Sequence, residues 1–381
     1  MYRRSLEAEV IGAAKKYRGI VLLGPRQSGK TTLARALFPS FRYLSLEDPD
    51  LRRLALSDPR ALLRDTSESL ILDEVQRAPE LLSYLQGRLD DPTSQQRFIL
   101  TGSQNLLLAE KVSQTLAGRT RIFSLLPLSQ RELQLNGVRS DDDLDARLLR
   151  GGYPRIYDQD LDPTQWLAQY YATYVERDVR QLSAISDLDL FDRFMRLLAG
   201  RAGQLLNLSS LGADCGVSQP TASAWLSILK TSYICLTLEP HFRNFSKRLI
   251  KSPKAYFLDT GLLCYLLRLR TTEQLSSHPL RGAIFENWVV AERMKGFLNA
   301  GEEAPLYFWR DSRGHEVDLV VDRGAQLEPV EVKSAATFDP SFLDGLRYFS
   351  TLQQHSGGQI IYGGDRSFHL HDFQVTSWRE V

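Results

Sequence analysis

Two short stretches of the sequence carry residues whose types and spacing could do chemistry. In "GPRQSGKTT", Gly24, Gly29, Lys30 and Thr31 have the spacing of a phosphate-binding loop. Glycines let backbone amides face the phosphates of a nucleotide, the lysine reaches the β and γ phosphates, and the threonine hydroxyl binds magnesium. In "EVDLVVDRGAQLEPVEVKS", residues 316–334, acidic and apolar residues alternate on both sides of a turn. The first stretch predicts a nucleotide site and the second a metal-binding hairpin.

The context of the glycine-rich stretch is that of a nucleotide-binding domain. Apolar residues 20–23 predict a strand before it, and residues 32–37 predict a helix after it. A third apolar strand, 98–100, leads into "TGSQN", where Thr101, Ser103 or Gln104 could sense the γ phosphate, although Thr101 and Ser103 are also turn formers. We predict ATP and Mg²⁺ as cofactors, bound by Gly24, Pro25, Arg26, Gln27, Ser28, Gly29, Lys30, Thr31, Thr32 and Ser103.

The stretch "LILDEVQ" supplies acids for hydrolysis, because an apolar strand ends in two carboxylates. Asp73 is placed to hold the hydrated magnesium together with Thr31, and Glu74 to polarise the attacking water. A strand that happens to end in two solvated acids is the alternative, and the phosphate loop argues against it. Hydrolysis of ATP, and not binding alone, is therefore the prediction.

Phosphoryl transfer spreads negative charge over oxygens, so a catalytic arginine is expected. The stretch "LAGRTRIF" offers Arg119 and Arg121, and we choose Arg119 beside Lys30, Asp73 and Glu74 as the catalytic set. If a neighbouring subunit supplies this arginine, ATP lies at a subunit interface, and the protein is a homo-oligomer for which a hexameric ring is one candidate. The alternative is that both arginines form surface ion pairs.

Composition narrows the class of protein. The chain has 381 residues, 43% of them hydrophobic and 24% charged, which is the balance of a globular protein of several domains. Its 47 basic and 46 acidic residues nearly cancel, so any attraction to nucleic acid must come from a local patch. The three separated cysteines argue against a zinc ribbon, a redox motif or a disulfide scaffold, and no apolar run reaches the length of a membrane span. We therefore expect a cytoplasmic protein that does not bind membranes.

The pattern of elements divides the chain into an α/β protein of several domains. Short apolar runs alternate with helical patterns as far as residue 128, which predicts a parallel sheet covered by helices. The next region has a mostly helical pattern, which is interrupted at "GGYP". It is followed by a region with a helix, turn, helix and strand pattern, and the last region mixes helix and strands. We predict a nucleotide-binding core at 1–128, a helical lid at 129–202, a winged helix at 203–280 and a last α/β domain at 281–381.

The chain resembles a known family in eight motifs that occur in order. They are "GPRQSGKTT", "LILDEVQRAPEL", "FILTGSQNLLL", "LAGRTRIFSLLPLSQREL", "RGGYP", "FENWV", "EVDLVV" and "PVEVKS". Together they resemble the AAA+-type ATPases of bacteria and archaea that carry a C-terminal domain of unknown function related to the PD-(D/E)XK nucleases. The resemblance covers nearly the whole chain. It implies a P-loop sheet of the AAA+ type and a C-terminal domain with a restriction-endonuclease-like fold.

The middle of the chain indicates DNA binding. In "LNLSSLGADCGVSQPTASAWLSILK" a second helix begins after Ser218, with Ala222, Leu226 and Leu229 on its apolar side. The following "HFRNFSKRLIKSPK" carries five basic residues, which predicts a wing that contacts phosphates. A winged helix that packs only against other domains is the alternative. The predicted DNA-binding residues are Arg243, Lys247, Arg248, Lys251 and Lys254.

The hairpin, finally, predicts a second metal site. A turn at residues 324–325 places Asp318 opposite Glu331 and Glu316 opposite Lys333, on the face away from the apolar one. Because two facing carboxylates repel each other, a magnesium ion held by Asp318 and Glu331 would stabilise the pair. The resemblance adds Glu286 and completes a nuclease-like set of Glu286, Asp318, Glu331 and Lys333. In the alternative, Glu331 and Lys333 form a structural pair without turnover.

These expectations combine into one leading function and two rivals. The leading one is an ATP-hydrolysing oligomer that binds and remodels duplex or branched DNA in repair, recombination or defence. The first rival is an ATP-gated, magnesium-dependent DNA nuclease. The second is a nucleotide-controlled assembly switch without DNA chemistry.

Overall fold

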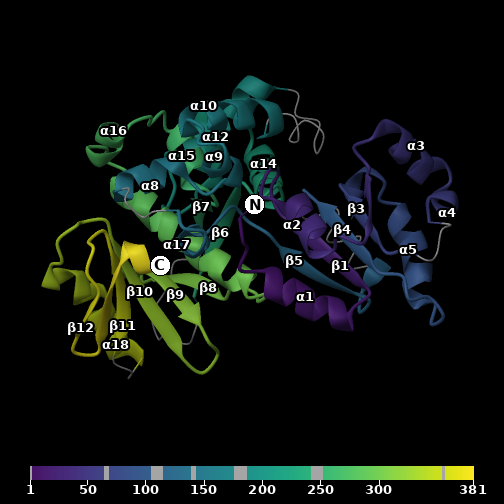
Figure 1. Ribbon diagram of the computed structural model, residues 1–381. Coiled ribbons are helices and arrows are strands. Elements are labelled where there is room, and N and C mark those ends of the chain that lie inside the picture. Colours follow the sequence, from purple (N-terminus) through teal and green to yellow (C-terminus); the bar gives the residue numbers. More distant parts are fainter. Residues whose placement is uncertain are drawn as a thin grey trace. The chain divides into compact units, whose positions relative to one another are not determined.

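The computed structural model describes residues 2–63, 68–103, 115–138, 143–175, 187–241, 252–353 and 357–381. The chain forms two compact units. The first consists of Met1–Leu128 with Thr231–Tyr233 and Gly296–Glu302, and the second of Ser129–Lys230, Ile234–Lys295 and Glu303–Val381. Figure 1 labels most of the helices and strands of both units. Among the described residues no helix is both long and apolar enough to cross a membrane.

The first unit is built on a five-stranded sheet with the order β2-β3-β4-β1-β5, and all neighbouring strands are parallel. The central strand β1 has the sequence GIVLL and is buried along its whole length, as expected for a strand with helices on both sides. The predicted parallel sheet is confirmed. Its strands are β1 (Gly19–Leu23), β2 (Arg42–Ser45), β3 (Leu70–Asp73), β4 (Phe98–Gly102) and β5 (Thr120–Ser124).

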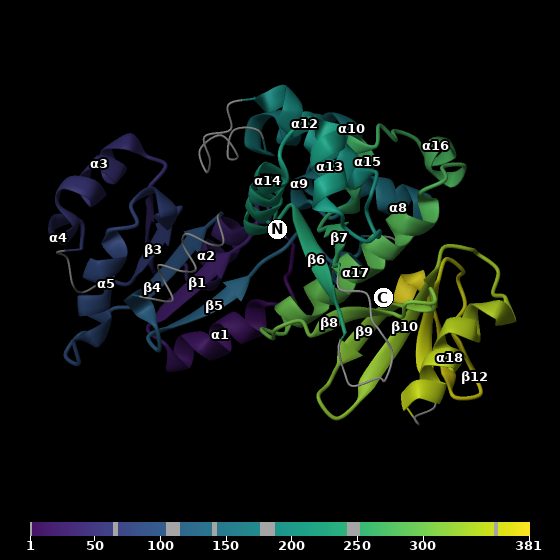
Figure 2. The ribbon, with the colours of Figure 1, turned by 180° about the vertical axis from the view of Figure 1, so that it is seen from behind.

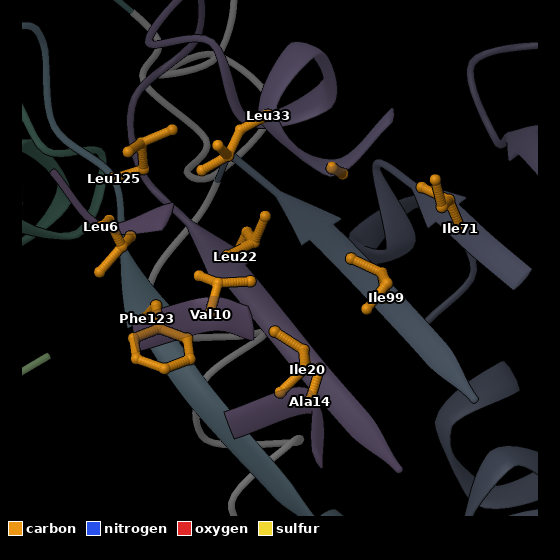
Figure 3. Close-up of a cluster of buried hydrophobic side chains, with 11 residues drawn as sticks. Leu6, Val10, Ala14, Ile20, Leu22, Leu33, Ile71, Ile99, Phe123 and Leu125 are labelled. Atoms are coloured by element: carbon orange, nitrogen blue, oxygen red, sulfur yellow. The ribbon is translucent and has the colours of Figure 1, made fainter. Parts of the chain in front are cut away.

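Helices α1 and α2 cover one face of this sheet. Figure 3 shows the side chains of Ile20 and Leu22 pointing into a core with Val10 of α1 and Leu33 of α2, while Ile99 joins from β4. The other β1 side chains, which alternate with these, face the opposite side of the sheet. The helices of this unit are α1 (Glu7–Lys16), α2 (Lys30–Leu37), α3 (Pro49–Ser57), α4 (Pro59–Leu62), the 3₁₀ helix η1 (Val75–Arg77) and α5 (Leu81–Asp90).

The second unit begins with short helices whose ends are set by local sequence. Ser129 and Glu132 form a reciprocal capping box at the start of α7. The predicted break at "GGYP" lies between α8 and α9, where Gly151 has a positive φ of 68° and Pro154 opens the next helix. The helices are α7 (Gln130–Leu135), α8 (Leu144–Arg150), α9 (Pro154–Asp158), α10 (Pro163–Tyr170), the π-helix η2 (Tyr171–Val175), α12 (Leu188–Ala199), α13 (Leu208–Cys215), α14 (Gln219–Thr231), α15 (Thr260–Leu266), α16 (Thr272–Ser276), α17 (Arg281–Asn299), η3 (Pro340–Leu343), α18 (Asp344–Gln353) and η4 (Trp378–Glu380).

An eight-stranded sheet runs through the second unit in the order β12-β13-β11-β10-β9-β8-β6-β7 (Figure 2). Strand β6 pairs in parallel with β8, so the sheet is continuous across residue 280, where the sequence pattern suggests a boundary between two domains. The pairing joins segments far apart in the chain. The strands are β6 (Cys235–Pro240), β7 (Lys254–Phe257), β8 (Leu306–Arg310), β9 (Glu316–Asp322), β10 (Leu327–Lys333), β11 (Gly358–Tyr362), β12 (Phe368–Leu370) and β13 (Phe373–Ser377).

Helices α13 and α14 are joined by a tight turn and precede the hairpin of β6 and β7. Gly216 ends α13 in the left-handed conformation, and the Ser218 hydroxyl accepts a hydrogen bond from the Thr221 N–H at the start of α14. Ala222, Leu226 and Leu229 are buried, as predicted from their spacing. The order of elements in this region is therefore helix, turn, helix, hairpin.

Candidate functional site

The phosphate loop occupies residues 24–29, between β1 and α2. Its backbone is left-handed at Gln27 and Gly29, with φ values of 64° and 97°. Gly24 has a φ of 146°, and a Cβ atom there would lie 2.1 Å from the Leu125 carbonyl oxygen. Only glycine fits such a close approach. The loop leads into the N-terminus of α2, where backbone N–H groups and the helix dipole attract anions.

Lys30 is the first residue of α2, and its ammonium group lies over the loop. Its Nζ atom donates hydrogen bonds to the carbonyl oxygens of Gly24, at 2.9 Å, and Pro25, at 2.7 Å. The Ser28 hydroxyl is buried and has no hydrogen-bond partner in the described part of the chain. Buried hydroxyl groups in proteins are nearly always hydrogen-bonded, so the Ser28 hydroxyl is available to a bound ligand. The loop residues therefore fit a phosphate chain, and Lys30 is positioned to neutralise it.

Asp73 lies at the carboxyl end of β3 and holds three hydroxyl groups. Its Oδ1 atom accepts hydrogen bonds from Thr31, at 2.8 Å, and from Thr101, and its Oδ2 atom accepts one from Tyr43 at 2.9 Å. Burial and the charge of Asp73 raise the pKa of Tyr43 to about 12, so the phenol stays a donor. A hydroxyl and a carboxylate side by side form a donor set that suits Mg²⁺.

Glu74 follows in an unusual backbone conformation, with a φ of 56° that few residues other than glycine adopt. Its Oε2 atom accepts hydrogen bonds from the Ser103 hydroxyl, at 3.0 Å, and from the Gln76 amide. Its backbone N–H is bonded to the Thr101 hydroxyl at 3.2 Å. The carboxylate is thus held in one orientation, and Ser103 contacts Glu74.

The remaining predicted contacts lie around the loop. Arg26 forms a long ion pair of 3.4 Å with Glu47, and Thr32 is exposed in the first turn of α2. Gln104 lies outside the described residues. Three residues of this region went unnoticed in the sequence: Tyr43, Gln76 and Arg4. Arg4 bridges the carbonyl oxygens of Ser28 and Leu126 at 2.8 and 2.7 Å, which ties the loop to the chain after β5.

Arg119 lies at the edge of the sheet where the strands begin, its amino-terminal edge, whereas the phosphate loop lies at the edge where they end, its carboxyl edge. It directly precedes β5, whose first residue pairs with Gly19 at the start of β1, whereas the loop follows the end of β1. Five residues of strand separate the two edges by about 16 Å. Arg119 forms an ion pair of 2.5 Å with Asp90 and lowers the pKa of that carboxyl. Within its own subunit Arg119 therefore does not reach the nucleotide.

Arg121 is held by its own unit. Its guanidinium donates a hydrogen bond of 2.7 Å to the Gly301 carbonyl oxygen and lies over the ring of Phe123. These contacts explain its place in β5 without a catalytic role.

The hairpin of the second unit has the predicted register. Val330 pairs with Leu319, so the next step along the strands places Glu331 opposite Asp318, and Gly324 takes the positive φ of the turn. The sequence places these acids on the face away from the apolar one, and little of that face is exposed here: Glu331 is 7% exposed and Asp318 is half-buried.

The structure brings Glu286, Asp318, Glu331 and Lys333 together, and it adds a residue that the sequence placed elsewhere. Lys254, predicted to contact DNA, is 2% exposed and forms ion pairs with Glu286, at 3.0 Å, and with Glu316. It is a strand residue of β7 with an inward side chain, so a role in an exposed wing is ruled out. The other four predicted wing residues, Arg243, Lys247, Arg248 and Lys251, lie outside the described residues.

Burial dominates the electrostatics of this acidic cluster, by which we mean Glu286, Glu316, Asp318 and Glu331 with Lys254 and Lys333. Burial first, and then the charge of Asp318, raise the pKa of Glu286 to about 7 and that of Glu331 to about 8. Burial also raises the pKa of Asp318. For Lys254, burial acts to lower the pKa, but the surrounding carboxylates more than offset it and the pKa is raised. The ammonium groups therefore stay charged, whereas some carboxyls keep their protons.

Both predicted metal ligands, Asp318 and Glu331, accept hydrogen bonds from groups of the protein. Across the described ranges no group of three or more histidine, cysteine, aspartate or glutamate side chains is arranged to hold a metal ion. The Glu331 Oε1 atom accepts a hydrogen bond of 2.5 Å from Lys333, and the Asp318 Oδ2 atom accepts one of 2.8 Å from the Val332 N–H. One oxygen of each of the two predicted ligands is therefore in use.

Three segments of the chain match models of known protein families. Residues 16–134 match the family model described as AAA domain. Residues 141–273 and 281–381 match two models described as domains of unknown function, DUF8612 and DUF4143. With the parallel sheet and the phosphate loop, the first match defines a P-loop ATPase of the AAA type, an enzyme that binds and hydrolyses nucleotide.

Two mycobacterial relatives match almost the entire chain. They are "Uncharacterized protein Mb2031c" of Mycobacterium bovis and "Uncharacterized protein Rv2008c" of Mycobacterium tuberculosis, each 33% identical over 378 residues, which cover 98% of this chain and 82% of the relative. The chain belongs to the family of these two proteins. Among solved structures, a Walker-type ATPase of Pyrococcus abyssi matches 70% of this chain and 96% of its own, at 15% identity and a TM-score of 0.47. A RuvB variant of Thermotoga maritima matches 61% and 88%, at 19% identity and a TM-score of 0.33.

Proposed function

We propose that the chain is a magnesium-dependent ATPase that works as a homo-oligomer, with Arg119 of one subunit completing the active site of the next. The observation that carries this proposal is the position of Arg119. It lies beside Asp90 at the amino-terminal edge of the sheet, whereas Lys30, Asp73 and Glu74 lie at the carboxyl edge. If Arg119 stabilises the transferring phosphoryl group, it must then do so from another subunit.

The residues of the nucleotide site divide the work of hydrolysis. Lys30 would exchange its bonds to the loop carbonyls for the phosphate oxygens of ATP. Mg²⁺ held by Thr31 and Asp73 would neutralise charge that develops between the β and γ phosphates. Glu74, oriented by Ser103 and Gln76, would accept a proton from the attacking water.

Mixing two inactive variants tests the shared site. Arg119→Ala should lower kcat by about 10³-fold or more while sparing ATP binding, and Glu74→Gln should bind ATP without hydrolysing it. In mixed oligomers some interfaces join an intact Glu74 to an intact Arg119, so part of the activity should return. Arg121→Ala, which removes a guanidinium two residues along the same strand, is the control and should keep kcat near its original value.

Two outcomes would contradict the shared site. Hydrolysis by Arg119→Ala at the original rate would remove the arginine from the mechanism. An absence of rescue in mixtures, together with a monomeric mass in the presence of ATP, would rule out a site between subunits.

DNA is the partner that the second unit favours. The succession of α13, a tight turn, α14 and a β hairpin supports a winged helix, and the sequence between β6 and β7 carries Arg243, Lys247, Arg248 and Lys251. We propose that ATP turnover remodels duplex or branched DNA held there. Measuring ATP hydrolysis with linear, single-stranded and four-way DNA tests this, since a DNA-remodelling enzyme should hydrolyse faster with its substrate. A rate unchanged by every DNA would favour a protein-assembly switch.

A further inference from the structure

The acidic cluster of the second unit already contains a cation of its own. The Lys254 Nζ atom lies 3.0 Å from the Glu286 Oε1 atom and also pairs with Glu316, and the lysine is almost fully buried. A buried ammonium is tolerated only where carboxylates pair with it. We propose that Lys254 is the resident cation of this cluster, in the place of the divalent metal that the sequence predicts between Asp318 and Glu331.

The charges of the cluster are close to balance without a metal. Its four carboxylates belong to Glu286, Glu316, Asp318 and Glu331. Lys254 and Lys333 supply two positive charges, and Arg310 adds a third through a hydrogen bond of 2.9 Å to Glu316. A divalent ion added to this set would meet two ammonium groups at short range. Its binding would therefore be opposed by charge repulsion.

Several of the carboxylate oxygens are also committed to groups of the protein. Magnesium takes an octahedron of about six oxygens. The Glu286 Oε1 atom accepts hydrogen bonds from both Lys254 and the Tyr256 hydroxyl, the latter at 2.6 Å. Glu286, Asp318 and Glu331 each have one oxygen that accepts a hydrogen bond from the protein, and the other Glu331 oxygen, Oε2, is buried without a hydrogen-bond partner among the described residues.

Strand pairing within the sheet fixes the position of Lys254. It pairs with Leu238 of β6 and forms an isolated bridge with Leu205, so its backbone is fixed on both sides. Its ammonium group lies 5.5 Å from the centre of the Phe308 ring, a further favourable contact for a cation. The side chain thus links β7 to α17 and β9. Its ion pair with Glu316 connects strands that lie on the two sides of the β6–β8 pairing.

Manganese binding measured on the full chain tests the proposal. The chain carries Asp73→Asn in every case, without nucleotide, so that the phosphate-loop site takes up no metal. Free Mn²⁺ is followed by electron paramagnetic resonance. We expect the Asp73→Asn chain to bind no Mn²⁺ in the second unit at millimolar concentration. Lys254→Met in the same chain should create a site for roughly one ion, because it frees the carboxylates of Glu286 and Glu316 from their buried counter-ion.

Matched variants separate this effect from loss of charge in general. Lys230→Met removes an exposed lysine that bonds Thr237, and it should bind no more Mn²⁺ than the parent chain. Adding Asp318→Asn to the Lys254→Met chain should abolish the new site. In EDTA, the melting temperature of the Lys254→Met chain should lie below that of the parent chain. Added Mn²⁺ should restore part of this difference.

Two results would overturn the proposal. One is Mn²⁺ binding by the Asp73→Asn chain that disappears with Asp318→Asn, since the metal would then share the cluster with Lys254. This comparison needs no Lys254 variant and so holds even if Lys254→Met fails to fold. The other is a folded Lys254→Met chain that binds no Mn²⁺, because Lys254 would then not be what keeps the metal out.

Discussion

Single side chains decide which site can hold a metal. Asp73 accepts three hydroxyl hydrogen bonds, and hydroxyls can be exchanged for magnesium and its waters without leaving a buried charge unpaired. Asp318 and Glu331 instead lie near the ammonium groups of Lys254 and Lys333, which cannot leave without such a loss. The same residue type, a buried carboxylate at a strand, therefore serves two different purposes in the two units.

At this scale the phosphate loop gives the first test. Lys30→Ala should weaken ATP binding roughly 10- to 100-fold, because the charged hydrogen bonds from its ammonium group to the phosphates disappear. Glu74→Gln should bind ATP as the original protein does and lower kcat by about 10²- to 10⁴-fold. Calorimetric titration with ATP and a phosphate-release assay separate the two effects. Equal affinity in Lys30→Ala would contradict the assignment of this lysine.

The raised pKa values of Glu286 and Glu331 predict how stability depends on pH. Both carboxyls have pKa values in the folded protein, about 7 and about 8, that lie above their ordinary value of 4.5, so the folded state binds protons more tightly than the unfolded state. Their contribution to stability is present below about pH 4.5 and is lost as pH rises through 7 to 8. Each unit of pKa difference corresponds to about 1.4 kcal/mol.

A comparison with Glu331→Gln isolates this effect, since glutamine does not titrate. We expect the variant to gain stability relative to the original protein as pH rises from 5 to 8, as measured by urea unfolding. Parallel pH profiles for the two proteins would show that Glu331 does not carry a raised pKa.

At the scale of elements, local sequence predicted what local forces determine. The phosphate loop, the strand before Asp73 and the hairpin of β9 and β10 are encoded within a few neighbouring residues, and all three were found. The sequence predicts an exposed, DNA-binding Lys254, whereas the structure buries it. Its ion-pair partners lie more than 30 residues away, and a run of basic residues predicts an exposed segment when the pairing of β7 is unknown. Tyr43 and Arg4 carry no spacing signal, since their roles depend on strands and turns brought together only in the fold.

The segment between β6 and β7 gives a test at this scale. Neutralising Arg243, Lys247, Arg248 and Lys251 together should weaken binding to all DNA sequences by a similar factor, because phosphates are common to every sequence. If each of these side chains neutralises one phosphate, the slope of log affinity against log salt should flatten by about 3.6. Fluorescence anisotropy over a salt series measures it. An unchanged slope would place DNA on another surface.

At the scale of the whole molecule, the continuous sheet of the second unit is the feature that sequence patterns could not reveal. The pattern changes at residue 280, yet β6 and β8 pair across that point, and Lys254 pairs with Glu286 of α17. Pairing between distant strands leaves no mark on either strand alone. The last hundred residues therefore complete a sheet that begins before them.

A cut in the connection between α16 and α17 tests this continuity. A protease site placed at residues 278–280 divides the chain where the sequence suggests a boundary, but it removes neither the β6–β8 pairing nor the Lys254–Glu286 ion pair. We expect the two pieces to stay associated after cleavage and to elute together in size-exclusion chromatography. Separately produced, residues 281–381 should be poorly folded, because β8 would present an unpaired edge and Glu286 and Glu316 would lack their buried counter-ion. Pieces that separate after cleavage, with 281–381 remaining a folded monomer, would show instead that the C-terminal part is a domain in its own right.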